Sequence, residues 1–125
     1  MFASHHNLNN LIAIIDYNKL QGLGRNNDII KLDSLKKKFE SFGWKAKEID
    51  GHDFHQLIES LSISKNEIIQ PSVVIAHTIK GKGVKSMENK LSSHYEVISN
   101  IKRRDEIIKE LNDLNTSFVQ SYRAN

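Results

Sequence analysis

Residues 11–22 read LIAIIDYNKLQG, an apolar run that ends abruptly in polar residues. Isoleucine, whose β-branch favours a strand, fills three of the first five positions. An apolar run without polar alternation is typical of a strand covered on both faces. The polar residues that follow offer the Asp16 carboxylate, the Asn18 amide and free backbone carbonyls. Because ligands of open α/β sheets bind at the carboxyl ends of strands, this segment predicts a binding site.

Two further segments predict strands. Residues 44–49 alternate apolar and charged side chains, which is consistent with a short strand. Pro71 introduces the apolar run 72–77, which favours a buried strand. Helical patterns separate the three segments, so we expect an α/β fold in which helices flank a parallel, doubly wound sheet. Three strands make a thin sheet, and the sequence therefore predicts part of a larger fold.

The helical patterns have signals at their ends. We expect Asp33 to cap a helix over residues 34–42, and Asp53 to cap a helix over residues 54–63. A last helix is expected over residues 100–114. Its apolar stripe comprises Ile101, Ile107, Ile108, Leu111 and Leu114.

Composition excludes several classes of protein. The chain has no cysteine, which rules out disulfides, thiolate metal sites and thiol catalysis. Its 18 basic and 15 acidic residues leave a net charge of +3, with no stripe of basic and aromatic residues. We therefore expect no nucleic-acid partner. No apolar run approaches the roughly 20 residues of a membrane span. Residues 1–6 lack the basic start and apolar core of a signal peptide. A cytoplasmic protein without a membrane partner is expected.

Seven segments, taken in order, form a recognisable pattern: ASHH at 3–6, IIDYNKLQG at 14–22, FGW at 42–44, EIDGHD at 48–53, AHTIKGKGV at 76–84, MEN at 87–89 and HY at 94–95. Together they resemble the diphosphate-binding domain of transketolases, above all the separately encoded N-terminal subunit of many prokaryotes. The resemblance covers residues 1–110 and implies the thiamine-diphosphate-binding fold. We expect residues 1–114 to be the C-terminal part of that domain and residues 115–125 to be a C-terminal tail.

The resemblance implies thiamine diphosphate held through Mg²⁺. In the family motif an aspartate of a Gly-Asp-Gly turn, an asparagine and the carbonyl two residues after it bind the metal. By resemblance, Asn18 supplies the amide oxygen and Leu20 the carbonyl, so both are predicted metal and cofactor ligands. Hard oxygen ligands suit Mg²⁺. Taken alone, Asn18 is more typical of an Asx-turn that ends a strand. The surrounding segments make the ligand role the favoured interpretation.

Two more residues acquire roles from the resemblance. Lys80, in a Gly-rich loop after a strand, matches a basic residue that contacts the cofactor. His94 matches a histidine near the diphosphate and the substrate, and is the predicted catalytic residue because histidine moves protons near neutral pH. Ser93 stands where many relatives have tryptophan. Without the resemblance, both Lys80 and His94 read as solvated loop residues.

The Gly-Asp-Gly half of the motif is not in this sequence. The match to the family begins within a helix, so the chain is expected to be truncated at its N-terminus. The pyrimidine-binding half is expected further downstream or on another polypeptide. We therefore expect the chain alone to bind thiamine diphosphate very weakly and to be inactive, with an apolar edge and face of its sheet exposed.

The implied activity of the intact parent is transfer of a two-carbon ketol unit between sugar phosphates, in the pentose phosphate pathway. The implied partner is a pyrimidine-domain (C-terminal) subunit, in a dimer or heterotetramer. One alternative is a non-catalytic remnant or assembly piece completed by another chain. A second is a fragment of an enzyme similar to deoxyxylulose-phosphate synthase. The YNKLQ and MEN segments favour transketolase over the second.

Overall fold

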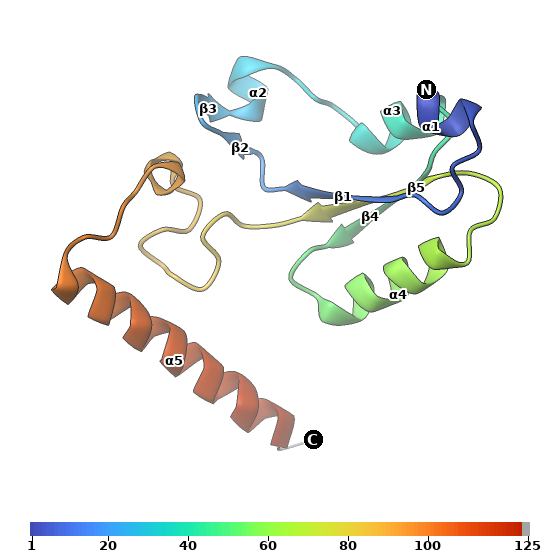
Figure 1. The fold of residues 1–125 in the computed structure, drawn as a ribbon. Coiled ribbons are helices and arrows are strands. Elements are labelled where there is room, and N and C mark those ends of the chain that lie inside the picture. The colour runs from blue at the N-terminus through green and yellow to red at the C-terminus, as the bar shows by residue number, and fades with distance from the viewer. Residues whose placement is uncertain (124–125) are drawn as a thin grey trace. The chain divides into compact units, whose positions relative to one another are not determined.

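The computed structural model describes the backbone of residues 1–123 and the side chains of residues 1–116. The chain forms two compact units, Met1–Leu20 with Arg25–Thr78, and Gln21–Gly24 with Ile79–Asn125 (Figure 1). The elements in chain order are α1 (Phe2–His5), β1 (Ile12–Tyr17), β2 (Leu20–Gln21), β3 (Gly24–Arg25), α2 (Asn26–Ile29), α3 (Leu35–Ser41), β4 (Lys45–Asp50), α4 (Phe54–Lys65), β5 (Ser72–His77), the 3₁₀ helix η1 (Leu91–His94) and α5 (Ile101–Arg123).

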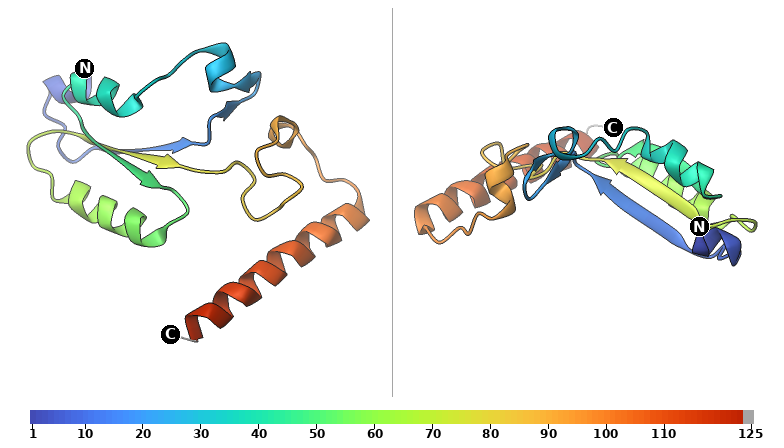
Figure 2. Two further views of the ribbon diagram at one scale, coloured as in Figure 1. Left: turned by 180° about the vertical axis from the view of Figure 1, so that it is seen from behind. Right: turned by 90° about the horizontal axis from the view of Figure 1, so that it is seen from above.

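The first unit is built on a three-stranded parallel sheet in the order β1-β5-β4. The central strand β5 is buried from Ser72 to Ala76. Leu57 and Leu61 of α4 pack on the face that carries Ile49, Val74 and Ala76. The views in Figures 1 and 2 place α3 on the opposite face. The expected α/β class, with a parallel sheet and flanking helices, is confirmed.

Strand β1 is less covered than its sequence predicts. Ile14 is 58% exposed and Leu11 is 39% exposed, so the expectation that both faces of this strand are buried is wrong for this chain. The physical reason is position, because β1 is an edge strand that pairs only with β5 in the described sheet. The expectation that the sheet shows an apolar edge and face is confirmed by Ile14.

Helix α3 begins one residue later than predicted. Asp33 is not its cap, because the Ser34 hydroxyl accepts the Lys37 N–H at 3.2 Å and Asp33 lies outside the helix with φ of 45°. Two adjacent residues of cap-forming type made the choice ambiguous in sequence.

Helix α4 begins as predicted. Asp53 Oδ1 accepts the N–H groups of His55 at 2.8 Å and Gln56 at 3.2 Å. The helix continues to Lys65 rather than ending at residue 63.

Helix α5 also runs further than predicted. It continues past the expected end at Leu114 to Arg123, since neither glycine nor proline interrupts this stretch. Residues 124–125 of the expected tail lie outside the described residues. Of the predicted apolar stripe only Ile107 is buried, and the division into a domain of residues 1–114 and a tail stays a prediction. Within the described residues, no helix is long and apolar enough to span a bilayer.

Gly43 is required where α3 ends. Its φ of 77° lies in the left-handed region, and a Cβ there would overlap the Ser4 hydroxyl and lie 3.2 Å from Ser4 Cβ. The absence of a side chain at Gly43 therefore lets α1 approach the end of α3.

We predict that Gly43→Ala lowers the free energy of unfolding by about 1–3 kcal/mol, because it combines an unfavourable φ with a steric overlap. Urea unfolding of the purified chain measures the effect. The control is Lys36→Ala on the exposed face of α3, which is expected to change stability by less than about 0.5 kcal/mol. Equal effects of the two substitutions would contradict the assigned role of Gly43.

The Asp53 cap predicts a pH dependence. The Gln56 side-chain amide, followed by the backbone N–H groups of Gln56 and His55, stabilises the carboxylate and lowers the pKa of Asp53 below its ordinary value. A lowered folded-state pKa contributes stability above the unfolded-state pKa of about 3.9, and this contribution is lost as pH falls through the folded-state value.

Asp53→Asn keeps a capping oxygen but cannot titrate. We expect the unfolding free energy of the wild type to fall more steeply below about pH 4 than that of this variant. Gln56→Ala should give an intermediate slope, because it removes the largest stabilising contact of the carboxylate. Urea unfolding over a pH series checks both expectations, and parallel curves for wild type and Asp53→Asn would disprove them.

Candidate functional site

The predicted ligand turn follows β1 directly. The Leu20 N–H donates to Asn18 Oδ1 at 3.0 Å, and the Lys19 carbonyl accepts the Asn26 N–H at 3.0 Å. The first contact is the Asx-turn that Asn18 alone suggested. It engages one lone pair of an amide oxygen that has two, so Oδ1 keeps the capacity to bind a cation.

Lys19 lies between the two predicted metal ligands in a left-handed conformation, with φ of 64°. A non-glycine residue in this region costs of order 1–3 kcal/mol, and such residues concentrate at functional sites. The left-handed residue reverses the chain immediately after the strand. This turn holds Asn18 and Leu20 close together, as the motif requires.

Polar side chains gather where the strands of the first unit end. The Thr78 hydroxyl donates to the Asp16 carboxylate. The rings of Tyr17 and His77 meet edge to face at 5.3 Å, and His77 Nε2 lies 3.8 Å from Glu48 Oε1. The register pairs Asp16 with Ala76 and Tyr17 with His77, which explains why these groups from separate strands are neighbours.

The donors of the turn suit a hard cation bound together with phosphate, rather than an all-protein metal site. An amide oxygen and a backbone carbonyl are neutral oxygen ligands of the kind that Mg²⁺ accepts. Among the described residues, no group of three or more His, Asp or Glu side chains could hold a metal ion by itself. Gln21 Nε2, next to Leu20 in the chain, is buried without a hydrogen-bond partner.

Lys80 and His94 lie in the second unit, where short contacts order the loop that carries them. The Asn89 N–H donates to the Lys80 carbonyl at 3.0 Å, and the Gly83 N–H donates to Glu88 Oε1 at 3.1 Å. The Ser93 hydroxyl donates to the Met87 carbonyl at 2.9 Å. Ser93 therefore fastens the loop just before His94.

His94 ends η1, and its ring meets that of Tyr95 edge to face at 4.8 Å. The Tyr95 hydroxyl donates to the Gly22 carbonyl at 3.2 Å. Tyr95 and Gln21 are the residues here to which sequence reasoning assigned no role. The pattern HY gave no signal that the tyrosine hydroxyl would meet a residue far away in the sequence.

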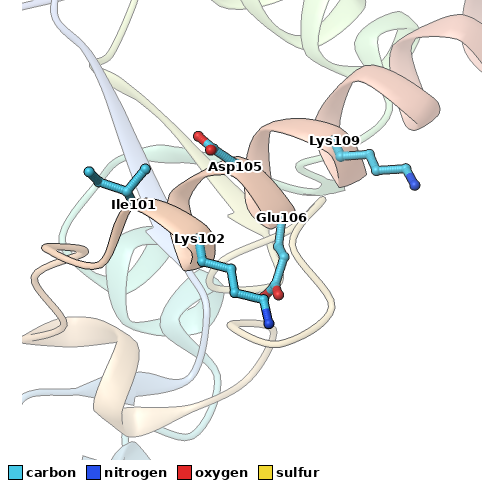
Figure 3. A pocket seen from close by; sticks show the side chains of 5 residues that line it. All are labelled: Ile101, Lys102, Asp105, Glu106 and Lys109. Carbon is cyan, nitrogen blue, oxygen red and sulfur yellow. The ribbon is translucent and has the colours of Figure 1, made fainter.

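Helix α5 carries a shallow hollow of a different kind (Figure 3). All five residues that line it belong to this one helix. One is an isoleucine, two are lysines and two are acidic residues. A surface formed by a single helix encloses no ligand, and none of the predicted site residues contributes to it. The hollow therefore stays outside the candidate site. Its residues are Ile101, Lys102, Asp105, Glu106 and Lys109.

The family described as transketolase, thiamine diphosphate binding domain, matches residues 1–111. The chain belongs to this family, as its motifs predicted. The match includes all four predicted site residues, Asn18, Leu20, Lys80 and His94, whose individual roles stay predictions.

Two of the relatives to which the chain is similar are named as transketolase subunits. The chain is 40% identical over 94 residues to the 6-deoxy-6-sulfo-D-fructose transketolase subunit of Clostridium sp. (strain MSTE9), covering 75% of this chain and 34% of that protein. It is 42% identical over 96 residues to an apulose-4-phosphate transketolase subunit of Actinobacillus succinogenes, covering 76% of this chain and 34% of that protein. The chain thus spans 34% of the length of each of these two relatives.

The fold agrees with a solved transketolase. The crystal structure of the Campylobacter jejuni enzyme superposes with a TM-score of 0.70 at 29% sequence identity, covering 74% of this chain and 14% of that enzyme. A parallel sheet with flanking helices is therefore what this chain shares with that enzyme.

Proposed function

We propose that this chain supplies part of the diphosphate-binding half of a split transketolase-like enzyme, which transfers a two-carbon ketol unit between sugar phosphates. The observation that carries the proposal is the turn after β1, where Asn18 Oδ1 and the Leu20 backbone lie together within the family-matched segment. The relatives are named as transketolase subunits, which supports a partner that carries the pyrimidine domain on a separate chain. We place the assembly in the cytoplasm, as a dimer or heterotetramer, with the pentose phosphate pathway as its setting.

In this proposal, Asn18 Oδ1 and the Leu20 carbonyl hold Mg²⁺, whose remaining ligands are phosphate oxygens and groups that other segments supply. Thiamine diphosphate, when bound, supplies the carbon nucleophile and electron sink for ketol transfer.

The second unit contributes the charged and proton-moving groups. The Lys80 ammonium attracts phosphate, and the ordered loop from Lys80 to Asn89 holds its backbone in place. His94 donates a hydrogen bond to substrate or diphosphate and moves a proton near neutral pH. Both side chains act on ligands of the assembled enzyme.

A second candidate function is that of a non-catalytic assembly piece completed by another chain. The observation that favours it is the apolar edge strand β1, where Ile14 is 58% exposed. An exposed apolar edge offers its unpaired backbone groups to a further strand. The two candidates differ in one measurable property, because only the first requires the side chain of Asn18.

We predict that Asn18→Ala weakens Mg²⁺-dependent binding of thiamine diphosphate by the assembled enzyme by roughly tenfold or more, since it removes a metal ligand. Asn18→Asp, which keeps a hard oxygen, should retain more binding than Asn18→Ala. Calorimetric titration of this chain mixed with a pyrimidine-domain subunit measures both, alongside a ketol-transfer assay. The chain without its partner is expected to be inactive.

The matched control is Asn112→Ala on α5, which is expected to leave binding unchanged because Asn112 lies in the helix outside the candidate site. Equal binding by Asn18→Ala and Asn112→Ala would refute the metal-ligand role of Asn18. If the wild-type assembly binds neither cofactor nor metal and transfers no ketol unit, the assembly-piece alternative is the better description.

A further inference from the structure

Gly22 and the adjacent residues His94 and Tyr95, which are distant from it in sequence, form one cluster inside the second unit. The Tyr95 hydroxyl donates to the Gly22 carbonyl at 3.2 Å across 73 positions of the sequence. The His94 ring rests edge-on against the Tyr95 ring, with centroids 4.8 Å apart and planes at 71°. The aromatic pair thus has one hydrogen bond to the turn between β2 and β3.

Gly22 leaves the space that this cluster needs. A Cβ at position 22 would overlap the Tyr95 hydroxyl, lie 3.4 Å from Tyr95 Cζ and lie 3.7 Å from His94 Nε2. The φ of Gly22 is not positive, so an L side chain is sterically compatible with its backbone. The requirement for glycine is therefore the close approach of Tyr95 and His94, rather than an unusual backbone conformation.

The cluster is solvent-accessible, and Tyr95 is 68% exposed. An exposed hydrogen bond contributes little to overall stability. Here the hydrogen bond from the Tyr95 hydroxyl restricts the orientation of the Tyr95 ring. Rotation of the Tyr95 ring away from Gly22 would remove the surface against which the His94 imidazole rests, so the hydroxyl bond also restrains His94.

We infer that Tyr95 is a positioning residue that fixes the His94 imidazole beside the Gly22 turn. The inference rests on the proposed function, in which His94 acts on the bound ligands. Leu20, a predicted metal ligand, is separated from Gly22 only by Gln21, so the segment that Tyr95 holds continues directly from the predicted ligand turn.

A double substitution tests the inference. In Gly22→Ala the new methyl group meets the Tyr95 hydroxyl, so the ring is displaced and His94 with it. In the double variant Gly22→Ala with Tyr95→Phe the clashing oxygen is gone, and the remaining contact with the ring at 3.4 Å is tolerable. We therefore expect Tyr95→Phe to suppress the effect of Gly22→Ala.

The readout is the His94 Cε1–Hε1 resonance of the full chain, assigned by its loss in His94→Gln. Gly22→Ala should move this resonance, and the double variant should return it close to its position in Tyr95→Phe alone. Tyr17→Phe is the matched control, because Tyr17 pairs with His77 in the same edge-to-face manner. It should leave the His94 resonance in place.

If Gly22→Ala and the double variant give the same displaced resonance, or if neither moves it, Tyr95 does not position His94. Circular dichroism of each variant shows whether the variant is folded. Tyr95→Phe alone is a milder test of the positioning role, because it removes the hydroxyl and keeps the ring. A broader His94 Cε1–Hε1 resonance in Tyr95→Phe than in Tyr17→Phe supports the inference. Equal line widths in the two variants contradict it.

Activity of the assembly with its partner subunit separates this inference from the proposed function. Gly22→Ala should lower kcat on the order of tenfold, because a small misplacement of an acting group is costly, and the double variant should recover most of the loss. If the resonances respond as expected while kcat does not change, the positioning role stands and the catalytic role assigned to His94 fails.

Discussion

The parallel pairing of β5 with both β1 and β4 is the constraint on which the first unit depends. Strand β5 contributes Val74 and Ile75, both with no exposed surface, and it supplies the backbone partners of both neighbours. The register sets His77 opposite Tyr17 on one side and Asp50 on the other. The three strands therefore end at one level, and the loops that follow them leave from a common edge.

That shared edge determines what the turn after β1 can do. The Asp16 carboxylate accepts a hydrogen bond from the Thr78 hydroxyl. Asn18 and Leu20 offer neutral oxygens from the turn in which Lys19 is left-handed. Neutral ligands bind a divalent cation well only when anionic ligands complete its shell. The turn is suited to a metal that arrives with a phosphate-bearing ligand, and this agrees with the family to which the chain belongs.

The sequence predicted the elements that depend on local patterns. The apolar runs at Ile12 and Ser72 and the Asp53 cap were identified because strand propensity and capping act over a few residues. Burial of β1 was predicted wrongly, because whether Ile14 is covered depends on neighbouring strands and helices that no local pattern reveals. The cap of α3 is Ser34 rather than the predicted Asp33, and only the backbone geometry distinguishes these two adjacent residues.

Only part of the candidate site could be predicted from the sequence. Asn18, Leu20, Lys80 and His94 were found through the resemblance of whole segments, since each residue type alone is common in loops. The contact of Tyr95 with Gly22 could not be predicted, because it joins residues 73 positions apart through one hydroxyl. The close approach of His94 to Gly22 could not be predicted either, because these residues are also far apart in the sequence.

The central claim is that the turn after β1 binds a metal ion together with a diphosphate. Paramagnetic relaxation tests it most directly, with Mn²⁺ in place of Mg²⁺ because the two ions favour the same oxygen ligands. Mn²⁺ and thiamine diphosphate, added to the ¹⁵N-labelled chain assembled with a pyrimidine-domain subunit, should broaden the Asn18 side-chain amide and the Leu20 and Gln21 amides first. Broadening centred on Asp105 and Glu106 of α5, with the Asn18 signals unchanged, would contradict the account.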